Sequence, residues 1–295
     1  MNKNYLILPF LISIIVVIVV IWPLISIKTH RLDKELLDLP YIINKVDELG
    51  KGSFQLNWQE IIAIIAIEAD KDLSQITEEE LQECASYFIS NNSVLPFDIV
   101  LEKLDLNFKE KEIAYNNLEQ LKNYGYTPTK TNPKSFEMKF INSIKEGAIE
   151  NYHLYGILPS ITIAQAILES NWGRSELVEK GNNLFGIKKG FNWKGEVIHF
   201  ETKEGFNEYI TDEFRKYKSL SASIIDHGLF LKENYRYTRA GVFDAKTYIG
   251  QAKALEEAGY STAEDENGNK IYANMLEELI RQYNLQLIDH EVLYL

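Results

Sequence analysis

A glutamate ends an apolar segment that reads PSITIAQAILES, residues 159–170. Thr162, Gln165 and Glu169 recur at helical spacing, so they share one narrow face of a predicted helix that is otherwise apolar. The macrodipole disfavours a carboxylate at a helix C-terminus, and apolar neighbours remove water from it. Both effects raise a carboxyl pKa, and a carboxyl group that keeps its proton near neutral pH suits a general acid. A polar face that meets solvent is the alternative interpretation.

The residues before this helix predict how it begins. The Ser160 hydroxyl, directly after Pro159, is expected to cap the helix by accepting from a free backbone N–H group. Further helices are expected on both sides of residues 159–170, and the alternating segment GEVIHFETKE predicts a β-hairpin between them. The expected fold class is therefore α+β, mostly α, with a cleft between the two parts.

The chain of 295 residues is long enough for two domains. We expect an N-terminal membrane anchor at 1–30, a small helical domain at 31–126, a linker at 127–136 and a catalytic domain at 137–295. Thr77 and Glu80 form a capping-box pattern in the helical domain, whose role the sequence leaves open. Pro128 and Pro133 among threonine, asparagine and serine mark the linker.

The anchor is predicted from residues 5–27, which carry no charge and are long enough to span a bilayer as a helix. A cleaved signal peptide is the alternative, but it favours small residues at a cleavage site, and no alanine occurs before Ala63. Basic residues flank the span on both sides, so charge alone leaves its orientation open.

Composition excludes several classes of protein. The net charge is −12, with no basic patch in either half, and this argues against a nucleic-acid partner. Cys84 is the single cysteine, which rules out an intrachain disulfide and a thiolate zinc cluster; we expect it to be buried. No phosphate loop or zinc-binding motif occurs, and no cofactor or metal is expected.

Four segments in one order carry a family resemblance: PSITIAQAILESNWGRS, NNLFGIK, FRKYKSLSASIIDHGLFL and ALEEAGYST. Together, from about Phe140 to Leu285, they resemble the glucosaminidase domain of glycoside hydrolase family 73. Enzymes of this family are bacterial endo-β-N-acetylglucosaminidases that cut peptidoglycan. The resemblance implies a lysozyme-like helical domain with a small β-lobe over a glycan cleft. It also implies an extracytoplasmic location on the cell-wall side of the membrane, which decides the orientation of the anchor.

The resemblance also implies the catalytic residues. Glu169 matches the family's catalytic acid, and Tyr260 matches a tyrosine kept beside it. The family places its second carboxylate in the β-lobe after a T-x-E pattern, which Thr202 and Glu204 fit; Glu201 is the competitor. Residues three apart on a strand point to opposite faces, so only one of the two glutamates is expected to face the cleft.

Four residues are expected to contact the glycan or shape its cleft. Gln165 shares the face of Glu169, and Trp172 is placed either to stack on a sugar ring or to pack in the cleft wall. Asn183 and Phe185 match a turn that forms the cleft floor, Phe185 chiefly as a structural residue. The histidines, His199 and His227 included, are assigned no chemistry.

The sequence thus predicts a membrane-anchored peptidoglycan hydrolase that cuts on the reducing side of N-acetylglucosamine. Three alternatives remain: a lytic transglycosylase, a muramidase of the same fold, and a wall-binding scaffold with a degenerate site. Intact Glu169 and Tyr260 argue against the scaffold. Glycan strands of peptidoglycan and the membrane are the expected partners; any protein partner is left open.

Overall fold

The computed structural model describes residues 32–68, 71–122, 124–125, 131–204 and 208–294, with the backbone alone for 201–204 and 208–210. The predicted anchor at 1–30 lies outside this part of the chain. Within it, no helix is both long and apolar enough to cross a membrane.

Residues 32–125, here called the helical region, build one hydrophobic core around Trp58, Ile61 and Leu81. The Thr77 hydroxyl accepts from the Glu80 N–H and the Glu80 carboxylate from the Thr77 N–H, so the predicted capping box is confirmed. Cys84 is buried, as expected, and burial raises the pKa of its thiol to about 12. The elements are η1 (Lys34–Leu36), α2 (Leu39–Leu49), α3 (Trp58–Ile65), η2 (Leu73–Gln75), α4 (Glu78–Phe88), β1 (Ile89–Ser90), β2 (Ser93–Val94), α5 (Phe97–Lys103) and α6 (Phe108–Leu121).

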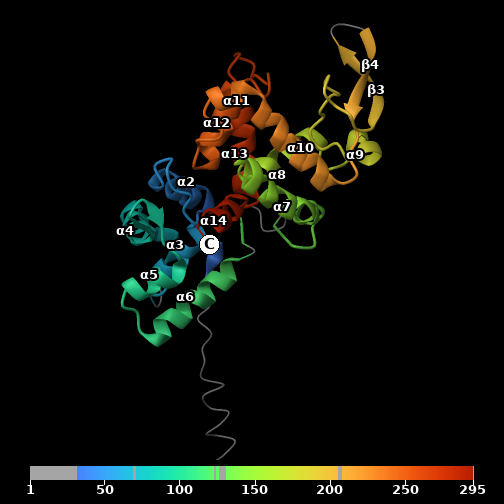
Figure 1. Cartoon of the computed structure of the whole chain (residues 1–295). Coiled ribbons are helices and arrows are strands. Elements are labelled where there is room, and N and C mark those ends of the chain that lie inside the picture. The colour runs from blue at the N-terminus through green and yellow to red at the C-terminus, as the bar shows by residue number, and fades with distance from the viewer. Residues whose placement is uncertain (1–31, 69–70, 123, 126–130, 205–207, 295) are drawn as a thin grey trace, which may run out of the picture.

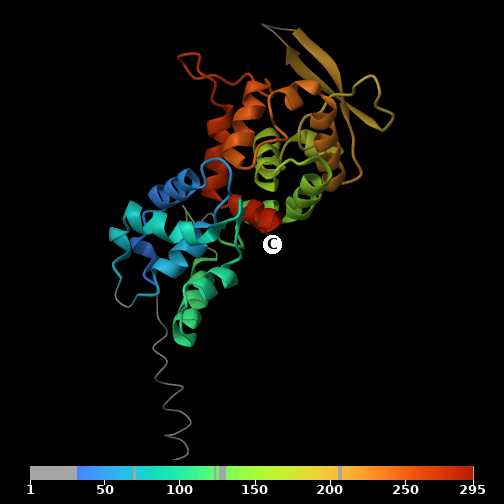
Figure 2. The same cartoon turned by 60° about the vertical axis from the view of Figure 1, so that its left-hand side comes forward.

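Residues 131–294, here called the C-terminal region, build a second core. The expected mostly α fold with a small hairpin is confirmed. The hairpin projects from the end of this region that lies farthest from the helical region (Figures 1 and 2). The elements are α7 (Phe136–Tyr155), α8 (Pro159–Ser170), α9 (Glu176–Gly181), β3 (Val197–Glu204), β4 (Glu208–Arg215), α10 (Leu220–Glu233), α11 (Tyr235–Arg239), α12 (Tyr248–Glu257), α13 (Tyr272–Gln282) and α14 (Gln286–Tyr294).

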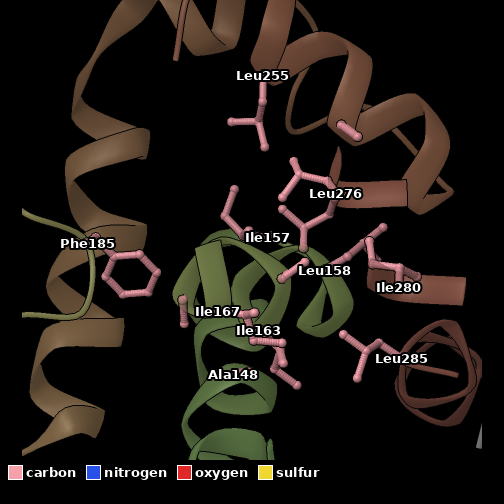
Figure 3. Packing of buried hydrophobic residues seen from close by; sticks show 14 of the residues in the cluster. Ala148, Ile157, Leu158, Ile163, Ile167, Phe185, Leu255, Leu276, Ile280 and Leu285 are labelled. Carbon is pink, nitrogen blue, oxygen red and sulfur yellow. The ribbon is translucent and has the colours of Figure 1, made fainter. Parts of the chain in front are cut away.

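Helix α8 runs through the middle of the second core. Its apolar residues Ile163 and Ile167 lie among Leu276, Ile280 and Leu285 from the end of the chain (Figure 3). Every residue from Pro159 to Ile167 is buried, so packing on all sides fixes this helix.

The start of α8 differs from the prediction. Leu158 is the N-cap and makes no side-chain cap hydrogen bond, so Ser160 does not cap the helix. The Ser160 hydroxyl instead donates to the Asp289 carboxylate on α14 at 2.5 Å, and the Ser160 N–H donates to the same group at 2.8 Å. A carboxylate from another helix thus satisfies one of the free N–H groups that begin α8 and complements the positive end of its dipole.

The end of α8 is a tight left-handed turn. Asn171, Trp172 and Gly173 have φ values of 49°, 61° and 73°. A Cβ at position 173 would lie 2.6 Å from the Phe140 ring, so glycine is required both by the backbone angle and by this close approach. The turn ends the helix directly after Glu169 and Ser170 and leaves the Glu169 side chain exposed.

Candidate active site

Glu169 lines a cavity of about 370 Å³. The other walls come from the turn at Phe185–Lys188, from helices α10 and α11 and from Tyr260 and Ser261. The Glu169 carboxyl group reaches this space although residues 159–167 of its helix are buried. Loss of water from its surroundings raises its pKa, as the sequence predicts for a general acid.

Tyr272 holds the Glu169 carboxyl group. Its hydroxyl donates to Glu169 Oε1 at 3.1 Å and accepts from Gln165 Nε2 at 3.2 Å. A donor at the carboxylate favours the charged form, so this bond lowers the pKa of Glu169 and partly offsets the effect of burial. The chain from Gln165 through Tyr272 fixes the direction in which the acid points.

Tyr260 and His227 form a second hydrogen-bonded pair of side chains in the cavity wall. The Tyr260 hydroxyl lies 3.1 Å from His227 Nε2, and the Tyr260 ring stacks on Tyr272 with centroids 5.4 Å apart. Burial lowers the pKa of His227 to about 3, so its ring is neutral. Its face stacks on Phe185 at 3.8 Å, which fixes the turn that bears Phe185 against α10.

Two basic residues border the cavity. The Arg236 guanidinium donates to the Gly259 carbonyl at 3.2 Å and to the Tyr237 hydroxyl at 2.5 Å, while the side chain itself stays exposed. Lys188 forms an ion pair with Asp212 of β4. The cavity therefore combines one carboxyl group of raised pKa, aromatic faces and positive charge at its edge.

The structure brings Glu169, Tyr260 and Phe185 together at this cavity, but it does not bring Gln165, Trp172 or Asn183 to its surface. Gln165 is fully buried and acts on Tyr272, so its predicted role as a substrate contact is replaced by a positioning role. The Trp172 ring packs edge-on against Phe140 and Tyr283, with centroids 6.1 and 5.0 Å apart. Of its two predicted roles, packing is therefore the one that the geometry supports.

Asn183 is also a structural residue. It is buried, and its amide nitrogen donates to the carbonyls of Ile187 and Arg215 at 3.0 and 2.9 Å. Its carbonyl oxygen accepts from the Ile187 N–H at 3.1 Å. With both ends of the amide engaged by the backbone, the side chain shapes the turn beneath the cavity and has no group left for a sugar.

The second carboxylate stays a prediction. Glu201 and Glu204 both lie on β3, with Thr211 and Glu208 as their register partners on β4, and their side chains lie outside the described part of the structure. Among the described residues that line the cavity, Glu169 is the only carboxylate.

Three residues of the site do not follow from the sequence patterns: Tyr272, His227 and Arg236. The histidines are scattered along the chain and suggest no site, yet the fold places His227 directly against Tyr260. Tyr272 begins a helix 103 residues after Glu169, and no local pattern connects the two. Arg236 lies between two tyrosines in the sequence, and arginine and tyrosine are both enriched at binding surfaces, which is a weak signal.

Comparison with known proteins identifies the family. The glucosaminidase family model, described as mannosyl-glycoprotein endo-beta-N-acetylglucosaminidase, matches residues 145–285. Exo-glucosaminidase LytG of Bacillus subtilis is 39% identical over 156 residues, which cover 51% of this chain and 52% of LytG. Peptidoglycan hydrolase FlgJ of Vibrio parahaemolyticus is 32% identical over 165 residues, which cover 52% of this chain and 51% of FlgJ. The chain thus spans about half the length of the curated relatives it matches.

One solved structure covers a comparable segment. The catalytic domain of the autolysin Auto from Listeria monocytogenes is 32% identical, with a TM-score of 0.46, over 62% of this chain and 98% of that domain. The matched residues 145–285 contain Glu169, Tyr260, Tyr272 and the turn at Phe185. Residues 145–285 thus form a glucosaminidase domain of glycoside hydrolase family 73.

Proposed function

We propose that this protein is a membrane-anchored peptidoglycan hydrolase that cleaves the β-1,4 bond on the reducing side of N-acetylglucosamine. The observation that carries the proposal is Glu169, a carboxyl group of raised pKa at the mouth of a cavity in a family of glycosidases. The name of the relative FlgJ supports peptidoglycan as the substrate.

In the reaction, Glu169 donates its proton to the glycosidic oxygen as the bond from that oxygen to the sugar C1 breaks. Positive charge develops on the ring, and a water molecule then adds to C1 and loses a proton. Glu204 is proposed to activate this water or to stabilise the developing charge, with Glu201 as the alternative. The Tyr272 hydroxyl keeps the acid aimed and accommodates its charged form after the proton has left.

Tyr260 is proposed to position the sugar. It belongs to the cavity wall, and its hydroxyl already interacts with neutral His227, which fixes the orientation of the phenol. Arg236 at the edge suits a substrate whose stem peptides carry carboxylates.

The proposed anchor rests on the uncharged segment 5–27 and places the enzyme on the outer side of the cell membrane. The full-length protein is then expected to fractionate with membranes at its unprocessed mass. Recovery of a soluble form that starts near residue 30 would contradict the anchor and leave the catalytic proposal intact.

Analysis of the products tests the bond that is cut. Purified cell wall is digested with the protein, reduced with borohydride and examined by mass spectrometry, and reduced N-acetylglucosamine ends are expected. Reduced N-acetylmuramic acid ends would indicate a muramidase, and anhydro ends would indicate a lytic transglycosylase. Binding without any cleavage would indicate a scaffold. Single terminal sugars in place of long fragments would identify exo cleavage, the activity that the name LytG states for that relative.

A further inference from the structure

The helical region docks directly on the C-terminal region. Helix α14 lies between the two in both views (Figures 1 and 2). Its residues Leu287 and Tyr294 pack against the core of the helical region, while Asp289 reaches α8. The family match ends at residue 285, directly before α14 begins. On the side of the C-terminal region, the contacts made by α14 therefore lie outside the matched segment, whereas those made by α12 and α13 lie within it.

The first contact is a buried carboxylate on the helical region. The side chain of Asp47 on α2 is 5% exposed. It accepts a hydrogen bond from the Tyr248 hydroxyl of α12 and lies 3.5 Å from Arg281 Nε of α13. The Gln55 amide donates to its other oxygen at 3.3 Å. A buried charge that loses such partners is strongly destabilised, so these bonds select one docking geometry.

The second contact uses the backbone of Gln55. Its carbonyl accepts from His290 Nδ1 at 2.9 Å, and its N–H donates to the Tyr294 hydroxyl at 3.1 Å, so both partners come from α14. Gln55 and His290 are almost completely buried, with exposed fractions of 1% and 2%. The Glu60 carboxyl group faces the other nitrogen of His290 at 3.7 Å.

Each contact is connected to the Glu169 carboxyl group by one helix, the first by α13 and the second by α14. Helix α13 presents Arg281 to Asp47 near its C-terminus and presents Tyr272, its first residue, to Glu169. On α14, Asp289 precedes His290 and holds the first turn of α8, which carries Glu169 in its last turn. A packed helix transmits a fixed position along its length.

We propose that the helical region is a positioning module of the enzyme: docked through Asp47 and Gln55, it fixes α13 and α14 and so holds the Tyr272–Glu169 pair in its productive geometry. Asp47, Arg281 and His290 are positioning residues and do not touch the substrate. The proposal deepens the proposed function and rests on it. It gives the helical region a catalytic purpose that a tethered spacer does not have.

The test compares Asp47→Ala with a control of similar cost in the full-length protein, purified in detergent. Val100→Ala opens a cavity at a buried position on α5, which packs against α4. At a temperature well below both unfolding transitions, Asp47→Ala is expected to lower kcat on cell wall about tenfold or more with KM within about twofold. Val100→Ala is expected to keep kcat within about twofold. Asp47→Asn, which keeps an oxygen for the Tyr248 hydroxyl, is expected to recover most of the loss.

Amide hydrogen exchange gives a readout that does not depend on activity. Asp47→Ala is expected to speed exchange in 272–282 and 160–170, whereas Val100→Ala changes only the helical region. If Asp47→Ala does not fold, Tyr248→Phe removes one hydroxyl from the same contact and is expected to change kcat and exchange in the same direction by a smaller factor. Unchanged exchange at 272–282 in the Asp47 or Tyr248 variant, or equal losses of kcat in Asp47→Ala and Val100→Ala, would overturn the proposal. An inactive wild-type protein would overturn the proposed function alone, because the exchange result still reports on the positioning.

Discussion

A carboxyl group lies at each end of helix α8, Asp289 of α14 at its first turn and Glu169 at its last, and loss of water raises the pKa of both. At the first turn, Asp289 is fully buried, its pKa is about 7, and both of its oxygens accept hydrogen bonds from Ser160. At the last turn, Glu169 opens into a cavity and accepts one hydrogen bond from Tyr272. A raised pKa therefore does not identify a catalytic acid by itself. Access to a cavity separates the group that can transfer a proton from the group that fixes the helix.

The largest loss of activity is expected from a change of Glu169, at the end of α8 that opens into the cavity. Glu169→Gln keeps the shape of the side chain and removes its proton, so activity on cell wall should fall by about a hundredfold or more, the usual contribution of general acid catalysis. Thermal unfolding should change little, since an amide at a helix C-terminus is no worse than a carboxylate. Digestion of cell wall by Glu169→Gln at a near wild-type rate would contradict the role of Glu169 as the general acid.

The second largest loss of activity is expected from a change at the proposed second carboxylate, Glu204. Glu204→Gln should lower kcat about tenfold or more with a smaller change in KM, because its charge matters most when positive charge develops on the sugar. Glu201→Gln is the matched control on the same strand and should leave kcat nearly unchanged. Steady-state kinetics of the two variants decide the assignment; the reverse result would move the role to Glu201, and two silent variants would favour assistance by the substrate's own acetamide group.

A smaller effect is expected from the hydrogen bond at the accessible end. Tyr272→Phe removes the donor that stabilises the charged form of Glu169, so the pKa of the acid should rise further. The acid then stays protonated to higher pH. The alkaline limb of the profile of kcat against pH should therefore shift to higher pH, while the maximal kcat falls severalfold. An alkaline limb that stays at the same pH or shifts to lower pH would show that this hydrogen bond does not lower the pKa of Glu169.

The smallest effect on activity is expected at the buried end, where stability is the observable. The pKa of Asp289 is about 7 when folded and about 4 when unfolded, so between these values the folded state holds a proton that the unfolded state has lost. Stability from this group is therefore greatest at the acid end and falls as pH rises, by at most about 1.4 kcal/mol per pH unit.

Asp289→Asn carries no titrating proton and should flatten this part of the dependence. Urea unfolding at pH 5 and pH 7 measures it for wild type, for Asp289→Asn and for Glu119→Gln, an exposed control in the helical region. If wild type and Asp289→Asn show the same change between the two pH values, the carboxyl group does not titrate as described.

Local patterns in the sequence predicted the elements of the fold well. The capping box at Thr77, the helix that ends at Ser170 and the β3 segment follow from short-range preferences that the folded chain keeps. The start of α8 was predicted wrongly for a physical reason. The Ser160 hydroxyl had a local use as a cap, but a carboxyl group 129 residues away bonds both this hydroxyl and the Ser160 N–H.

The site was predicted only in part, because some of its contacts also join residues that lie far apart in the sequence. Glu169, Tyr260 and Phe185 belong to motifs with a recognisable order, and the structure places all three at one cavity. Tyr272 and His227 act through contacts between distant elements, which no spacing in the sequence reveals. Burial also decides roles that residue type leaves open: Gln165 and Asn183 are polar, yet their amides serve the protein itself.

The central claim is that Glu169 protonates the leaving oxygen, and the dependence on the leaving group tests it most directly. An aryl glycoside of a chitooligosaccharide with a nitrophenol leaving group needs little protonation, whereas a sugar leaving group needs full protonation. The measurement is the ratio of wild-type to Glu169→Gln kcat on each substrate. We predict a loss of about a hundredfold or more on the natural glycan and of about tenfold or less on the aryl glycoside. Equal losses on both substrates would contradict the claim that Glu169 is the general acid.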